Sequence, residues 1–260
     1  MKKILILIIS LAFSMSLFAA SGSVIVISID ALHPDAIKIA NPANIGKLMS
    51  RGVFTLNGKS VTPPKTLVSH TAMVIGKKPE ESGYVSNTWN KGDKTVQGDT
   101  VFHDAKKAGY KTYFVYSKKK LGFLENPALD RSIFSKEDPV ADVEKIIGKE
   151  KDPFFIFLHI SGLDDIGPKY GWLSKEYLEE FLLIDEDLKN IIDYFINRSD
   201  TTIIITSDHA GHDKEHGTDH PEDYKLPLII YSKTTNFDYI KYSQYISYQL
   251  RDIVNKAIRK

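Results

Sequence analysis

Short apolar runs rich in β-branched residues alternate with segments of helical periodicity along most of this chain, and this alternation limits its possible folds severely. A strand that is apolar along its whole length is typical of a parallel sheet covered by helices on both faces. The pattern therefore predicts an α/β fold with a central, mostly parallel sheet in a single compact domain. The expected strands cover residues 23–29, 111–116, 154–159, 201–206 and 226–231. The expected helices cover residues 44–51, 100–108, 139–147, 177–196 and 242–258.

The amino terminus has the layout of a secretory signal peptide. Lys2 and Lys3 precede an apolar stretch over residues 4–18, and small residues end at Ser21. We expect residues 1–21 to be removed, which leaves a domain over 22–260 in the periplasm or outside the cell. An uncleaved membrane anchor is the alternative, although about 20 apolar residues are usual for a span.

Charge and cysteine content exclude several classes of protein. Without Lys2 and Lys3, 32 basic residues face 33 acidic ones, so the basic excess of a general nucleic-acid binder is missing. The chain contains no cysteine. An exported protein of this composition folds without disulfides, has no cysteine nucleophile, and must bind any metal through histidines and carboxylates.

A group of potential metal ligands follows the apolar run over residues 201–206. Asp208 and His209 come directly after Ser207, and His216 lies seven residues beyond His209. Ligands gather at the carboxyl ends of strands in open α/β sheets, and oxygen with imidazole suits zinc or a similar divalent ion. The alternative interpretation is a polar loop with scattered histidines.

Two further residues stand at positions that favour chemistry. Asp30 ends the first expected strand, where it contributes either a metal-binding carboxylate or the cap of a turn. Thr66 follows Pro63-Pro64-Lys65, and the residues after it can begin a helix. Its hydroxyl would then lie beside the positive end of a helix, where a phosphate also binds; a simple helix N-cap is the alternative.

Taken in chain order, these residues resemble a known family. The similarity runs from about residue 24 to 232 and rests on the joint spacing of several motifs. The chain resembles the alkaline phosphatase superfamily, and within it the type I phosphodiesterase/nucleotide pyrophosphatase group. The residues that carry the resemblance are Asp30, Lys65-Thr66-Leu67-Val68-Ser69-His70, the stretch 76–83, Asn87, Asp164, Ser207-Asp208-His209, His216 and Leu226-Pro227-Leu228-Ile229.

The resemblance implies an exported, metal-dependent phosphoester hydrolase that acts on a small phosphoester substrate. Members of this family use two divalent metal ions, usually zinc, and a Ser or Thr nucleophile that forms a phospho-enzyme; manganese is the alternative metal for this chain. By resemblance, Asp30, Thr66, Asp208 and His209 bind the ion that activates the Thr66 hydroxyl. Asp164 and His216 bind the other ion, and Asn87 donates a hydrogen bond to a phosphoryl oxygen.

One departure from the family pattern affects the second metal site. The family aspartate matched by Asp164 is followed four residues later by a metal-binding histidine, but here Pro168 occupies that position. The second site is therefore weak, empty, or completed by Asp165, His212 or His220. Two other functions follow as alternatives: a protein that binds a phosphorylated ligand without turnover, or a transferase that passes the phosphoryl or head group to an alcohol.

Other polar residues receive structural interpretations. The run Lys118-Lys119-Lys120 is read as a solvated turn in preference to a contact for a substrate anion. His33, His70 and His103 have no ligand-like neighbour in sequence, so we interpret them as histidines with structural partners or as exposed residues.

Overall fold

A seven-stranded sheet forms the centre of the protein. The computed structural model describes residues 22–258, so the expected signal peptide lies outside the described residues. The strands are ordered β2-β7-β6-β1-β5-β3-β4 across the sheet. They are β1 Ser23–Ile29, β2 Val53–Lys59, β3 Lys111–Tyr116, β4 Arg131–Phe134, β5 Phe154–Ile160, β6 Thr201–Thr206 and β7 Lys225–Ser232.

The sheet is mostly parallel, as predicted. Strand β1 lies near its centre and pairs in parallel with β5 and β6, while β3 pairs in parallel with β5 and β4. Strand β7 runs antiparallel to both β6 and β2. The sequence pattern missed β2 and β4, which are the two edge strands. Both carry partly exposed residues along their length, so neither has the continuous apolar run of a central strand.

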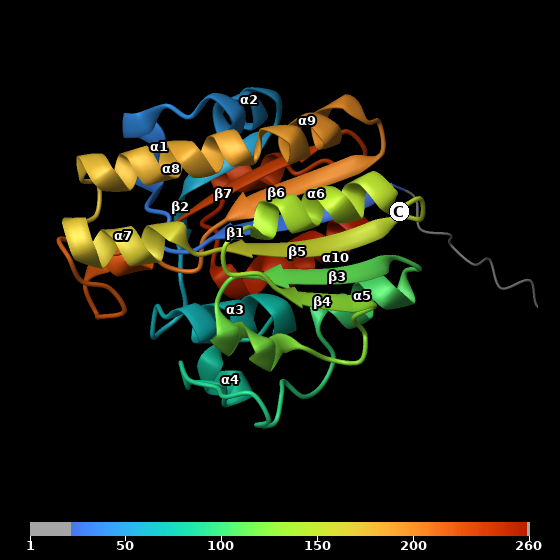
Figure 1. The fold of residues 1–260 in the computed structure, drawn as a ribbon, viewed down its shortest axis with the longest axis horizontal. Coiled ribbons are helices and arrows are strands. Elements are labelled where there is room, and N and C mark those ends of the chain that lie inside the picture. Colours follow the sequence, from blue (N-terminus) through green and yellow to red (C-terminus); the bar gives the residue numbers. More distant parts are fainter. Residues whose placement is uncertain (1–21, 259–260) are drawn as a thin grey trace, which may run out of the picture.

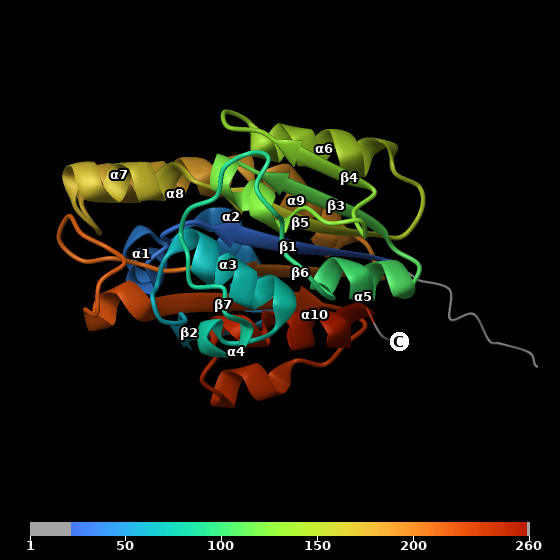
Figure 2. The same cartoon turned by 90° about the horizontal axis from the view of Figure 1, so that it is seen from below.

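Helices cover both faces of the sheet (Figures 1 and 2). Side chains alternate across β1, so Ile25 and Ile27 pack with the helices of one face while Val24 and Val26 pack with those of the other. The first face carries α1 Pro34–Ala40, α2 Ala43–Arg51, α6 Pro139–Lys149, α8 Lys175–Asp187 and α9 Lys189–Asn197. The second carries α3 Thr66–Ile75, α5 Val101–Lys107 and α10 Leu250–Ile258.

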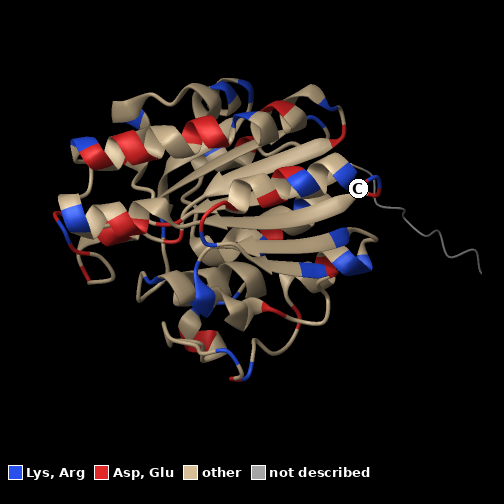
Figure 3. Cartoon of the chain, in the orientation of Figure 1, with Lys and Arg blue, Asp and Glu red and all other residues tan. Residues whose placement is uncertain are grey.

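The remaining short elements lie in the connections. They are α4 Pro79–Ser82, α7 Gly162–Tyr170, η1 Lys119–Leu124, η2 Pro221–Tyr224, η3 Asp238–Tyr242 and η4 Ser247–Gln249. Charged residues lie mainly on helices and loops, whereas the central strands are almost free of them (Figure 3). Across residues 22–258, no helix has both the length and the hydrophobicity that a membrane crossing requires.

Two of the predicted helices differ from the observed ones. The stretch 177–196 is two helices, α8 and α9, which meet at Leu188 and each bury one face. The closing helix begins at Leu250, because the stretch before it holds the exposed Tyr242 and the short 3-10 turns η3 and η4. In the sequence, the spacing of polar and apolar residues before Leu250 resembles the period of a helix, so the predicted helix began too early.

A buried carboxylate joins two of the helices. Asp185 of α8 accepts hydrogen bonds from the backbone amides of Asn44 and Ile45, at 2.9 and 2.7 Å, in the first turn of α2. The first amides of a helix have no partner within it, so this carboxylate caps α2 from a neighbouring helix.

Candidate metal and phosphoryl-transfer site

The turns after β1 and β6 are joined directly by hydrogen bonds. Ala31 donates its backbone amide to Asp208 Oδ1 at 3.1 Å, and Leu32 donates its amide to Ser207 Oγ at 2.9 Å. The pairing of β1 with β6 brings these turns together at one edge of the sheet. Asp30 and Asp208, both fully buried, therefore lie side by side although they are far apart in the chain.

Four buried ligand atoms converge at this edge. They have no hydrogen-bond partner among the described residues: Asp30 Oδ1, Asp164 Oδ1, Asp208 Oδ2 and His209 Nε2. His209 Nε2 lies 3.3 Å from Asp30 Oδ1, 3.5 Å from Asp208 Oδ2 and 3.7 Å from Asp164 Oδ1. Tetrahedral ligands that bind zinc at about 2.0–2.2 Å are separated from one another by about 3.3–3.6 Å. The distances to Asp30 and Asp208 lie in this range, and the distance to Asp164 is slightly longer. His209 Nε2 therefore belongs both to a potential metal-binding group with Asp30 and Asp208 and to a second such group with Asp164 and His216. We call the four unpartnered atoms the four-atom site.

Hydrogen bonds outside the four-atom site orient its histidine. His209 Nδ1 lies 2.9 Å from the carbonyl oxygen of Ala210. A carbonyl only accepts, so Nδ1 donates and Nε2 is directed at the three carboxylates. Metal-binding histidines commonly donate their second ring nitrogen in this way.

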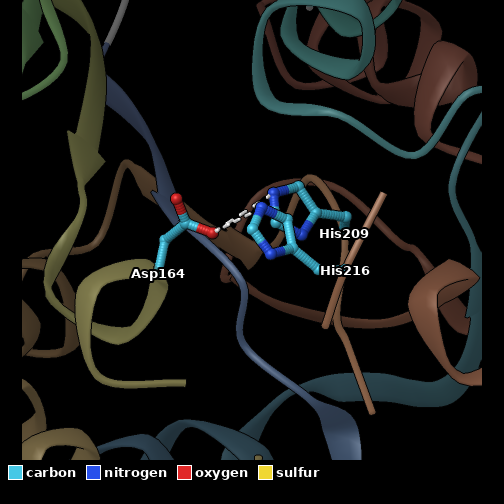
Figure 4. Close-up of side chains that lie close together, drawn as sticks. All are labelled: Asp164, His209 and His216. Carbon is cyan, nitrogen blue, oxygen red and sulfur yellow. Dashed lines mark ion pairs between the residues drawn. The ribbon is translucent and has the colours of Figure 1, made fainter. Parts of the chain in front are cut away.

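Asp164 and His216 extend the site toward solvent. His216 Nε2 lies 3.3 Å from Asp164 Oδ1, and its ring stacks on that of His209 with centroids 4.9 Å apart (Figure 4). The His216 side chain keeps 31% of its surface exposed, compared with 12% for Asp164. The centre is therefore open to solvent on the side of His216.

Thr66 is the first residue of α3 and is buried at the same edge of the sheet. Asn87 approaches from the loop after α4, and its Oδ1 accepts the backbone amide of Leu67 at 2.9 Å. With its oxygen occupied in this way, Asn87 has its amide nitrogen available to donate to a phosphoryl oxygen. The structure thus brings together all seven of the predicted site residues: Asp30, Thr66, Asn87, Asp164, Asp208, His209 and His216.

The interpretation of Lys118 as part of a solvated turn is wrong. Its ammonium lies 2.6 Å from Asp30 Oδ2, contacts Asp164 Oδ2, and lies 3.4 Å from Thr66 Oγ1. Burial alone would lower the pKa of Lys118, but Asp30 and Asp164 outweigh it and raise that pKa. The next lysines differ, since Lys119 is exposed and Lys120 Nζ lies 3.4 Å from Asn87 Oδ1.

Two buried histidines support the site from behind. His159 Nε2 on β5 lies 3.1 Å from Asp30 Oδ2, and its Nδ1 lies 3.0 Å from Ser117 Oγ. His70 contacts the Thr66 carbonyl through Nδ1 at 2.7 Å and Ser28 Oγ through Nε2 at 2.9 Å. Sequence reasoning gave His159 no role, although its place at the end of a buried strand was a usable signal.

The structure places none of the suggested replacements for the missing histidine in the second site. Pro168 lies in α7, four residues after Asp164, so the two positions share one side of the helix. His212 and His220 stack on each other, with centroids 3.8 Å apart, and His212 Nδ1 contacts Asp223 Oδ1 at 2.7 Å. Asp165 is exposed.

His33 and His103, which the sequence analysis interpreted together with His70, cap helices. His33 accepts from the amide of Asp35 at the start of α1 and contacts Glu222, while His103 forms a capping box with Thr100 at the start of α5. Both therefore have structural partners, in agreement with the sequence interpretation.

Crowded charges shift the pKa values of the ligands in the metal-free protein. Burial favours a raised pKa for Asp30, but the Lys118 ammonium and contacts with His159 and His209 hold that pKa well below its usual value. Burial and the Asp30 charge raise the pKa of Asp208 to about 7. Burial lowers the pKa of His209, but Asp208 and Asp30 outweigh it and raise the value to about 10. A divalent ion at the four-atom site therefore displaces protons when it binds.

The sequence of the chain matches a known family over most of its length. The sequence model of the type I phosphodiesterase/nucleotide pyrophosphatase family matches residues 24–226. The chain belongs to this family. The membership confirms the resemblance seen in the sequence, and the alkaline phosphatase-like fold agrees with it.

One relative is similar to most of this chain in sequence. GPI ethanolamine phosphate transferase 1 of Aspergillus fumigatus is 24% identical over 229 residues, which is 78% of this chain and 22% of that protein. The chain thus spans about a fifth of the length of this relative.

Two solved structures share the fold. The C-terminal periplasmic domain of EptC from Escherichia coli matches 92% of this chain and 82% of its own, with a TM-score of 0.64 and 12% identity. An inactive variant of murine ectonucleotide pyrophosphatase/phosphodiesterase 5, in complex with AMP, matches 73% of this chain and 57% of its own, with a TM-score of 0.59 and 19% identity.

Proposed function

We propose that this member of the family is an exported, metal-dependent phosphoester hydrolase in which Thr66 is the nucleophile. The observation that carries the proposal is the convergence of four buried, unpartnered ligand atoms, with Thr66 linked to them through Lys118. A bound divalent ion would supply the positive charge that favours the ionised Thr66 hydroxyl, and zinc suits this mixed set of Asp and His ligands.

The side chains divide the work of the first step. Thr66 Oγ attacks phosphorus, the bond from phosphorus to the leaving oxygen breaks with its electron pair going to that oxygen, and the hydroxyl proton passes to solvent. Asn87 donates its amide hydrogens to a non-bridging oxygen, and Leu67 holds Asn87 in place. Lys118, which Asp30 and Asp164 hold in place, offers its positive charge to the same phosphoryl group.

The acceptor in the second step separates two candidate functions. Water regenerates Thr66 and releases a phosphate in a hydrolase, and the exposure of His216 supports access for water. An alcohol acceptor gives a transferase instead, and the named relative in Aspergillus fumigatus, a GPI ethanolamine phosphate transferase, favours this second candidate. The periplasmic domain of EptC supports a location outside the cytoplasm.

The test combines turnover with trapping of the intermediate. Aryl phosphate mono- and diesters, including an aryl ester of phosphoethanolamine, are supplied with zinc or manganese, and the protein is quenched for mass spectrometry. We expect a phosphoryl adduct on Thr66, a loss of at least about 1000-fold in turnover for Thr66→Ala, and partial activity for Thr66→Ser.

A matched control lies in the same helix. Thr71 is also buried in α3, but its hydroxyl donates to the Leu67 carbonyl and does not face the four-atom site, so Thr71→Ala should keep most of the turnover. Adding a primary alcohol distinguishes the acceptors: phosphorylated alcohol in excess of free phosphate identifies a transferase. Wild-type rates in Thr66→Ala would exclude Thr66 as the nucleophile.

A further inference from the structure

The Lys118 side chain is placed where it touches both halves of the centre. Its ammonium contacts Asp30 of the first ligand set and Asp164 of the second, and it lies 3.4 Å from the Thr66 hydroxyl. Only 16% of the side chain is exposed. A lysine is almost never buried this far without paired charges, so these carboxylates hold it there.

The two carboxylates that contact Lys118 divide their oxygens between two positive charges. Oδ1 of Asp30 and Oδ1 of Asp164 face His209 Nε2 in the four-atom site. Oδ2 of each faces the Lys118 ammonium. Asp164, which the family resemblance assigns to the second metal ion, also lies beside His216, and the Lys118 ammonium occupies its other oxygen.

We propose that the Lys118 ammonium serves as the second cation of this centre, so that the folded chain binds one divalent ion instead of two. This inference rests on the proposed function, because it concerns the charges that surround the same phosphoryl group. A phosphoryl oxygen bound between the ion and Lys118 would accept a hydrogen bond from the ammonium. This hydrogen bond would take the place of a contact with a second metal ion.

The charge count supports one ion. Three carboxylates, Asp30, Asp164 and Asp208, contribute three negative charges, and one divalent ion with the Lys118 ammonium balances them. In the absence of a bound phosphoester, a second divalent ion would leave two positive charges in excess among these largely buried groups, which is unfavourable. The same position in α7 that would supply its third ligand holds Pro168, which cannot bind metal.

Metal binding tests the proposal independently of turnover. Zinc stoichiometry and affinity are measured by isothermal titration and elemental analysis on the folded wild type, Lys118→Met, Lys118→Arg and the control Lys119→Met. Wild type should bind one ion per chain. Lys118→Met keeps the length of the side chain without its charge, so it should bind zinc at least tenfold more tightly or accept a second ion.

The controls separate charge from structure. Lys119 is exposed, so Lys119→Met should bind zinc like wild type. Lys118→Arg keeps a cation and should stay at one ion, which provides a folded comparison if Lys118→Met is unstable. Two ions in wild type or in Lys118→Arg, or unchanged stoichiometry and affinity in Lys118→Met, would overturn the proposal. Failure of Thr66 as nucleophile would appear in the turnover and adduct measurements and would leave these metal counts unaffected.

Discussion

Replacing Asp208 with asparagine should stabilise the metal-free protein, although Asp208 is fully buried. Burial and the Asp30 charge raise the pKa of Asp208 from 3.8 to about 7. One pKa unit corresponds to about 1.4 kcal/mol, so above pH 7 the ionised carboxylate costs the fold about 4 kcal/mol. Asp208→Asn removes this charge and keeps an oxygen that can accept the amide of Ala31.

The pH dependence follows from the direction of the shift. A raised pKa means that the folded state holds the proton more tightly, so stability is greatest below the unfolded value and is lost as pH rises toward 7. The advantage of Asp208→Asn should therefore be about 4 kcal/mol at pH 8 and only about 2 kcal/mol at pH 5.

Urea unfolding in the presence of a chelator measures these differences. The matched control is Asp185→Asn, because Asp185 is also buried but receives two backbone amides of α2 and should lose about 1–3 kcal/mol. Excess zinc should stabilise wild type, by about 2.7 kcal/mol at 100 times the dissociation constant, and have little effect on Asp208→Asn. A chelated Asp208→Asn protein that is less stable than wild type at pH 8 would refute the reasoning.

Two further predictions concern other residues. Burial lowers the pKa of His33 despite the opposing effect of Glu222. The unfolded chain takes up a proton at His33 as pH falls below about 6.5, whereas the folded protein keeps this side chain neutral, so the folded protein loses stability there. His33→Asn keeps a capping side chain that does not titrate, so its urea midpoint should fall less than that of wild type between pH 7 and 5; equal slopes would contradict this. Combining Lys118→Met with Pro168→His should give two zinc ions per chain by elemental analysis. The double variant removes the competing charge of Lys118 and restores an imidazole beside Asp164. A single ion would count against position 168 as the place of the missing ligand.

The sequence was most informative where an apolar strand leads into a polar turn. Asp30 and Asp208 could be placed together because the carboxyl ends of neighbouring parallel strands share one edge of the sheet. Lys118 also follows a strand, yet three consecutive lysines look like a solvated turn. Its inward direction depends on carboxylates from β1 and α7, which no local pattern reveals.

Elements at the periphery were harder to predict for a different reason. Edge strands such as β2 bury only part of their surface, so their sequences lack a decisive period. The helix start at Leu250 depends on how the preceding turns pack, and the apolar spacing continued past it.

The hydrogen bonds between the turns after β1 and β6 also bear on how the chain folds. Ala31 and Asp208 are 177 residues apart, and β1 needs partners from both β5 and β6. Such non-local pairing carries a large loop-closure entropy and slows folding. The centre of the sheet therefore stays incomplete until the chain beyond β6 is available, and during that interval β1 has unpaired edges that favour aggregation. We therefore expect the metal ligands to come together only when the sheet closes, late in folding.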